Sequence, residues 1–142
     1  MYSDPKLEEK IVQHEGIRKF VYTDTMGFST VGIGRNISET GEGLSVDECF
    51  YLLRNDIDRC AKELSNLQWF SKQDDVRKSV LIELAFNIGT KGVLAFKSMI
   101  SALDAGLYAV AAKELLNSKW ATQVGRSRSQ DMASRLSSGR YL

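Results

Sequence analysis

Two carboxylates and a threonine stand close together near the start of the chain. Glu15 and Asp24 are nine residues apart, and Thr30 follows Asp24 by six residues, in the segment "HEGIRKFVYTDTMGFSTVGIG". Hydrolysis of a glycosidic bond uses two such acids, because one protonates the leaving oxygen while the other stays charged beside the developing oxocarbenium ion. Acids at this spacing can equally be solvated surface groups, so the pattern alone leaves both interpretations open.

Glu15 is expected at the end of a helix. Asp4 before Pro5 is typical of a helix start, and apolar residues at helical spacing follow as far as Gly16, a residue type that often ends helices. The negative end of the helix dipole would disfavour the charged form of Glu15, which is what a general acid requires.

Asp24 and Thr30 are expected on a β-hairpin. Residues 17–34 are rich in β-forming side chains on both sides of the turn residues "DTMG". A hairpin of this kind would fold Asp24 and Thr30 back toward each other. The segment that follows, "RNISETGEG" (residues 35–43), is expected to be a loop.

The glycines of "TVGIGRN" do not form a nucleotide-binding motif. A dinucleotide fingerprint that starts at Gly32 would need a glycine where Ile37 stands, and a P-loop that starts at Gly27 would need a lysine where Ile33 stands. Glycines in a strand more often mark close backbone approach, here either to a ligand or to the first helix.

The remaining sequence predicts helices. Ser45 to Glu48 has the spacing of a capping box, and a long helix should run from about residue 46 to 66. Its buried face is expected to consist of Cys49, Phe50, Leu53, Ile57, Cys60, Ala61 and Leu64. Further helices are expected over residues 76–89, 93–106, 108–120 and 126–136, separated by glycine or serine.

These elements predict an α+β fold in a single domain over residues 1–142. We expect a small N-terminal lobe with the hairpin (about 1–45), a connecting helix (about 46–66) and a helical C-terminal lobe (about 67–142). Hydrophobic residues make up 43% of the chain and charged residues 26%, which is ordinary for a soluble globular protein. We identify neither a signal peptide nor a membrane anchor.

Charge is distributed unevenly along the chain. Residues 1–71 carry 12 acidic and 8 basic side chains, whereas residues 72–142 carry 6 acidic and 11 basic side chains. A basic C-terminal half suits an anionic partner such as a cell-wall polymer, although scattered surface charge is the simpler explanation. Two arginines in "RSRS", without interleaved aromatic residues, are weak evidence for nucleic-acid binding, and we expect no nucleic-acid partner.

Cys49 and Cys60 are expected to be free thiols. They lie eleven residues apart in one expected helix, which separates them by about 16 Å, far beyond disulfide reach. Free thiols suggest synthesis in a reducing cytosol. With a single histidine and two cysteines, we expect no zinc site, and no other metal or cofactor.

The catalytic segment resembles that of bacteriophage lysozymes of the T-even phage type. The shared features are Glu-Gly, nine residues from Glu to Asp, six more to Thr, and then Gly-Ile-Gly. Resemblance continues in "LSVDECFYLLRNDI", "VRKSVLIELAFNIGTKGVLAF" and "AAKELLNSKWATQVGRSRS", so it covers nearly the whole chain. It implies a lysozyme-like α+β fold and a monomeric muramidase that hydrolyses the β-1,4 bond between N-acetylmuramic acid and N-acetylglucosamine in peptidoglycan.

The resemblance also implies roles for the three residues of the catalytic segment. Glu15 would be the general acid, Asp24 the second carboxylate, and Thr30 a group that helps to place the attacking water. A water between carboxylate and sugar implies inversion at the anomeric carbon. A lytic transglycosylase and a non-hydrolytic wall-binding protein are the alternatives.

Further positions match family residues in the C-terminal part. Phe86 and Asn87 match an aromatic and an amide that flank the substrate cleft, although Phe86 taken alone is more typical of a core residue. Trp120 matches a tryptophan packed in the C-terminal lobe. Arg126 matches an arginine that pairs with the catalytic glutamate, but the local alignment needs a one-residue gap, so Arg128 is a rival.

The sequence departs from the family at Arg35. This residue stands where the T-even enzyme has a histidine after Gly-Ile-Gly, so an ion pair made by that histidine is replaced or lost.

The resemblance also suggests a biological setting. We expect an endolysin that is made in the host cytoplasm and acts on the wall in the periplasm after the membrane has been opened. A role within a phage tail is the other possibility.

Overall fold

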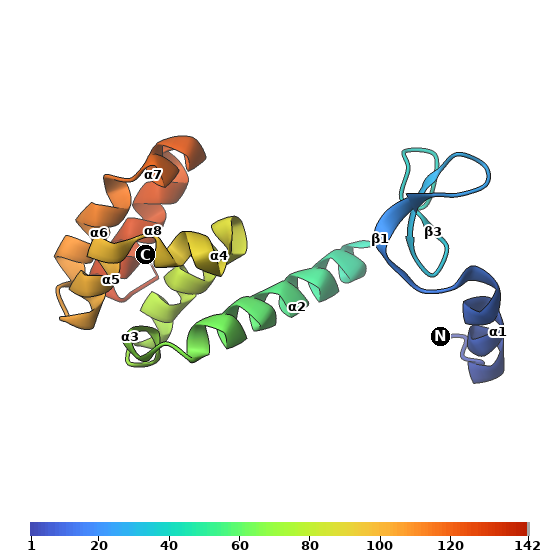
Figure 1. The fold of residues 1–142 in the computed structure, drawn as a ribbon, viewed down its shortest axis with the longest axis horizontal. Helices are drawn as coiled ribbons and strands as arrows, with labels where there is room; N and C mark the ends of the chain where they lie inside the picture. The colour runs from blue at the N-terminus through green and yellow to red at the C-terminus, as the bar shows by residue number, and fades with distance from the viewer. Residues whose placement is uncertain (142) are drawn as a thin grey trace. The chain divides into compact units, whose positions relative to one another are not determined.

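The computed structural model describes residues 1–141, which form eight helices and one three-stranded antiparallel sheet (Figure 1). The elements in chain order are α1 (Pro5–Glu15), β1 (Arg18–Thr23), β2 (Ser29–Gly32), β3 (Arg35–Asn36), α2 (Val46–Ser65), α3 (Gln68–Ser71), α4 (Asp75–Leu94), α5 (Lys97–Asp104), α6 (Tyr108–Leu116), α7 (Lys119–Val124) and α8 (Arg126–Ser138). The α+β class predicted from the sequence is therefore confirmed.

The chain divides into two compact units, and the boundary falls within α2. The N-terminal unit is Met1–Leu52, with α1, the sheet and the first turns of α2, and the C-terminal unit begins at Leu53.

Helix α1 begins and ends where the sequence predicts. The Asp4 carboxylate accepts hydrogen bonds from the backbone N–H groups of Lys6 (3.1 Å) and Leu7 (3.2 Å), which caps the helix. Gly16 follows the helix with φ 73°, a conformation that residues with a side chain rarely adopt. Glu15 is thus the last residue of α1.

The predicted hairpin is present, with β1 and β2 antiparallel. Tyr22 pairs with Thr30, and Thr23 pairs with Ser29. The "DTMG" turn joins the two strands, and it is closed by the Asp24 N–H, which donates to the carbonyl of Phe28 at 2.9 Å.

The prediction of a loop over residues 35–43 is wrong at its start. Arg35 and Asn36 form β3, which pairs antiparallel with β2 through Thr30–Asn36 and Val31–Arg35. Gly34 has φ 72°, so the chain can reverse tightly after β2 and return alongside it. A two-residue strand is too short to produce an alternating pattern in the sequence.

The predicted capping box opens α2. The Glu48 N–H donates to the Ser45 hydroxyl at 3.1 Å, and the Glu48 carboxylate accepts from the Ser45 N–H at 2.9 Å. The helix ends at Ser65, one residue before the predicted end.

The predicted buried face of α2 is correct only at its C-terminal end. Cys60 and Leu64 are buried, whereas Cys49, Phe50, Leu53 and Ile57 are exposed and Ala61 is half-buried. Helical spacing indicates which residues share a face, but it does not indicate which other elements cover that face.

The hydrophobic core that the structure describes lies in the C-terminal unit. Its large fully buried side chains come from α2, α4, α5, α6 and α8, and the largest are Leu64, Leu81, Leu84, Met99, Leu103, Leu115, Met132 and Leu136. Figure 1 shows α4, α5, α6 and α8 packed around one another. In contrast, Thr30 is the only buried residue among residues 1–52.

Two predicted helices of the C-terminal unit are each broken. The segment 93–106 contains the end of α4 and all of α5, and the segment 108–120 is divided between α6 and α7. Ser118 causes the second break, because its hydroxyl accepts the N–H of Ala121 at 3.2 Å and caps α7. The predicted break at Gly89 is confirmed by its φ of 79° within α4.

Within residues 1–141, no single helix has the length and apolar composition to cross a membrane, and only the pair α4 and α5, bent by 96°, meets both criteria when taken together.

The two cysteines have different surroundings, which makes the free-thiol prediction testable. Cys49 is exposed and Cys60 is buried, and both are free. We expect one thiol per native chain to react readily with a thiol reagent and the second to react only after unfolding. Cys49→Ser should remove the native reaction. A loss of that reaction after Cys60→Ser instead, or a mass change of the monomer on reduction, would contradict the assignment.

Candidate active site

The carboxylate of Glu15 lies directly against Gly34. A Cβ atom added to Gly34 would stand 2.9 Å from Glu15 Oε2 and 3.0 Å from its Cδ, closer than real Cβ atoms approach other groups. The last glycine of "VGIG" therefore provides the space for the Glu15 side chain. At Gly34 the structure shows close approach to the first helix, whereas an added Cβ at Gly32 would have no atom within 4 Å.

The Glu15 side chain is exposed, and only the backbone of Glu15 is fixed, as the last residue of α1. Among the described residues, no group donates a hydrogen bond to its carboxylate and no cation forms an ion pair with it. An acid of this kind keeps both oxygens available for a ligand.

Asp24 is fixed within the hairpin turn. Its Oδ1 accepts the backbone N–H groups of Met26 at 2.9 Å and Phe28 at 2.8 Å, and the residue is half-buried. These two donors set the orientation of the carboxylate. Oδ2 receives no hydrogen bond from residues 1–141 and is the oxygen that remains for chemistry.

Thr30 is fixed by the same backbone segment. Its Oγ1 donates to the carbonyl of Phe28 at 2.9 Å, and the residue is 2% exposed. Because the hydroxyl proton is used in this bond, the lone pairs of Oγ1 are left to accept from another donor. The N–H of Phe28 thus holds Asp24, and its C=O holds Thr30.

Phe86 and Asn87 lie on α4, shortly before its break at Gly89. Phe86 is 44% exposed and does not belong to the core. The Oδ1 of Asn87 accepts the indole N–H of Trp120 at 2.8 Å, which leaves its NH₂ group as the available donor. Trp120 is 5% exposed, so its predicted place in the core is confirmed.

Arg128 is engaged within the C-terminal unit. Its Nε is 3.2 Å from Glu83 Oε2, and the other oxygen of Glu83 is 2.6 Å from the guanidinium of Arg135. Arg126 is the first residue of α8 and forms no ion pair among the described residues. Arg128, Glu83, Arg135 and Phe86 belong to the lining of a hollow of about 580 Å³ in the C-terminal unit.

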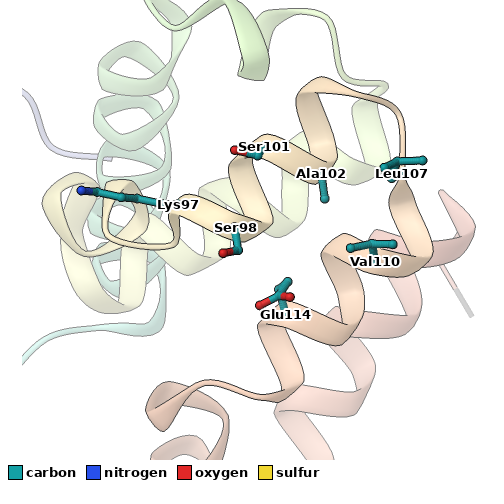
Figure 2. A pocket seen from close by; sticks show the side chains of 7 residues that line it. All are labelled: Lys97, Ser98, Ser101, Ala102, Leu107, Val110 and Glu114. Atoms are coloured by element: carbon teal, nitrogen blue, oxygen red, sulfur yellow. The ribbon is translucent and has the colours of Figure 1, made fainter.

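A second hollow of about 380 Å³ lies between α5 and α6 (Figure 2). Ser98 of α5 and Glu114 of α6 face each other across it in Figure 2, and Leu107 and Val110 line its apolar end. It contains none of the site residues predicted from the sequence. Residues 1–141 also contain no group of three or more His, Cys, Asp or Glu side chains that could hold a metal ion.

A pair of carboxylates such as Glu15 and Asp24 is the equipment that hydrolysis of a glycosidic bond uses. Comparison with known proteins agrees, because the family model described as phage lysozyme matches residues 12–136. The chain belongs to the phage lysozyme family. It is 26% identical to a probable T4-type lysozyme of Dictyostelium discoideum, over 80% of this chain and 84% of that protein. The protein is therefore a lysozyme-type glycoside hydrolase that acts on the peptidoglycan of cell walls.

The contact between Glu15 and Gly34 predicts a loss of activity in Gly34→Ala. The new methyl group would displace the carboxylate, and displacement of a catalytic group by about 1 Å can cost on the order of a hundredfold in rate. We expect at least about a tenfold loss of turnover on purified peptidoglycan. Positive φ also costs about 1–2 kcal/mol of stability in any residue with a Cβ.

Gly106→Ala is the matched control for this variant. Gly106 has φ +73° and no atom near the position of an added Cβ, so it carries the backbone cost without the contact. Gly106→Ala should lose stability but keep its turnover. Equal turnover in the two variants would show that the Glu15 side chain does not depend on Gly34.

Proposed function

We propose that this protein cleaves the β-1,4 bond between N-acetylmuramic acid and N-acetylglucosamine, with Glu15 as the general acid, Asp24 as the second carboxylate and Thr30 as the group that orients the attacking water. The observation that carries the proposal is a pair of hydrogen bonds with the backbone of Phe28. Its N–H donates to the Asp24 carboxylate at 2.8 Å, and its carbonyl accepts from the Thr30 hydroxyl at 2.9 Å. Two side chains held by one residue keep a constant separation, as the placement of a single water requires.

The chemistry follows from the groups that remain available. Glu15 gives its proton to the glycosidic oxygen as the bond from that oxygen to the anomeric carbon breaks. A water attacks the same carbon from the opposite face and passes one proton to Asp24 Oδ2. Its other hydrogen donates a hydrogen bond to a lone pair of Thr30 Oγ1 and stays on the new anomeric hydroxyl group. Attack from the opposite face inverts the configuration of the anomeric carbon.

Three further residues support this function. Phe86 and Asn87 are proposed to bind substrate, because Phe86 offers an exposed aromatic face and Asn87 presents an NH₂ group whose orientation is set by Trp120. We retain Arg126 as the supporting cation of the proposed function, since Arg128 is engaged by Glu83.

We further propose that the protein is a monomeric endolysin made in the host cytoplasm, which reaches the wall in the periplasm once the membrane has been opened. The free cysteines support this setting, because a protein made in a reducing compartment gains no disulfides.

The sugar ends released from purified peptidoglycan test the reaction. We expect reducing N-acetylmuramic acid ends, and NMR early in the digestion should show the α-anomer, because inversion converts the β bond. Anhydro ends would identify a lytic transglycosylase, which uses no water. Retention of the β-anomer would exclude the role proposed for the water, and binding without cleavage would identify a wall-binding protein.

Glu15→Gln tests the general acid. The amide has nearly the same shape but cannot supply the proton, so turnover should fall by at least about a hundredfold while binding to peptidoglycan is kept. Glu9→Gln makes the same chemical change at another exposed position of α1 and should have no effect. Turnover in Glu15→Gln above about a tenth of the parental rate would exclude Glu15 as the acid.

A further inference from the structure

Arg35 joins two parts of the N-terminal unit that follow it in sequence. Its Nη1 donates to the carbonyl of Gly43 at 3.0 Å and forms an ion pair with Glu48 Oε1 at 2.6 Å. The guanidinium therefore connects β3 to the end of the following loop and to the first turn of α2.

Glu48 connects this ion pair to the helix cap. The same Oε1 that meets Arg35 also accepts the N–H of Ser45 at 2.9 Å. The bond from Arg35, and after it the bond from the Ser45 N–H, lower the pKa of Glu48 from its ordinary 4.5 to about 2. The carboxylate is therefore charged at neutral pH, as the ion pair with Arg35 requires.

The loop between β3 and α2 is packed onto Asn36. The carbonyl of Asn36 accepts the N–H of Gly43 at 3.1 Å, and its side chain accepts the N–H of Ser38 at 2.9 Å. A Cβ atom added to Gly41 would stand only 2.6 Å from the Asn36 carbonyl oxygen. Both residues of β3 therefore bind the end of the loop, Arg35 through its side chain and Asn36 through its backbone carbonyl.

These contacts bear on Thr30 because β3 is its neighbour in the sheet. Asn36 pairs with Thr30 and Arg35 pairs with Val31, and the Ile37 N–H adds one bond to the carbonyl of Ser29 at 2.9 Å. A strand of two residues contributes little pairing energy of its own. Its position beside β2 therefore depends on the contacts that Arg35 and Asn36 make with the following loop and with α2.

We propose that Arg35 is a positioning residue that, through Glu48 and Gly43, holds β3 against β2 and so fixes Thr30 in the orientation that hydrolysis needs. This inference rests on the proposed role of Thr30. Arg35 acts through the strand and not on the substrate. Its effect should therefore appear in the rate of the chemical step and not in substrate binding.

The test removes each half of the ion pair. Glu48→Gln keeps the capping box, because the amide oxygen can still accept the Ser45 N–H, but it removes the charge that Arg35 meets. Arg35→Met removes the guanidinium and keeps an unbranched apolar stem. We expect each variant to lower kcat by about threefold to tenfold with little change in KM. The double variant should be no slower than the slower single variant, since both changes break one connection.

Arg59→Met is the matched control. Arg59 forms an ion pair of the same length, 2.6 Å, with Asp56 on the surface of α2, and its loss should leave kcat unchanged. Arg35→Lys should recover part of the rate, because an ammonium can meet Glu48 but lacks the extent of a guanidinium. NMR of the Thr30 methyl group should show a shift in Arg35→Met and Glu48→Gln but not in Arg59→Met.

Thr30→Ala separates a failure of this inference from a failure of the proposed function. If Thr30→Ala loses activity while Arg35→Met and Glu48→Gln behave like Arg59→Met, the positioning role is wrong and the function of Thr30 stands. If Thr30→Ala keeps full activity, the proposed role of Thr30 fails, and the positioning role fails with it. Additive losses in the double variant would also overturn the inference, because the two residues would then act separately.

Discussion

The backbone of Phe28 is the constraint on which the candidate site depends. Its N–H group fixes the Asp24 carboxylate and its carbonyl fixes the Thr30 hydroxyl, so one residue sets the relation between both side chains. The carbonyl also accepts the N–H of Asp24, which closes the hairpin turn. The same bonds therefore shape the turn and orient the groups that the proposed reaction uses. The Phe28 side chain takes no part in them, so the geometry depends on the path of the chain and not on that aromatic ring.

The two units are stabilised by different means. The core of the C-terminal unit consists of fully buried leucines and methionines from several helices, and the Trp120–Asn87 bond joins α7 to α4. In the described N-terminal unit only Thr30 is buried, and its elements are defined by caps, tight turns and the Arg35–Glu48 ion pair. Hydrogen bonds of this kind are directional. They suit the exact placement of polar groups better than non-directional hydrophobic contact does.

Local sequence signals predicted the elements that carry Glu15, Asp24 and Thr30. Asp4 with Pro5, the "DTMG" turn and the Ser45–Glu48 spacing each act within a few residues, so their outcome does not depend on the rest of the fold. Strand β3 was missed because a two-residue strand has no pattern, and its position depends on contacts with residues 43 and 48. The Asn87–Trp120 bond spans 33 residues, and no local pattern could indicate it. Ser118 is a residue type that caps helices, and the prediction of a single helix over residues 108–120 did not use it.

The short distance within the Arg35–Glu48 pair has a consequence for behaviour in salt. The two side chains are 39% and 40% exposed, so dissolved ions reach them, yet their charged atoms are 2.6 Å apart. Screening acts over a Debye length of about 10 Å at 0.1 M salt and about 3 Å at 1 M. Moderate salt therefore weakens attraction between charges about 10 Å or more apart, while the pair beside the candidate site is little affected. Ionic strength can thus change the long-range attraction that the protein exerts on other charged molecules without changing the local geometry around β3.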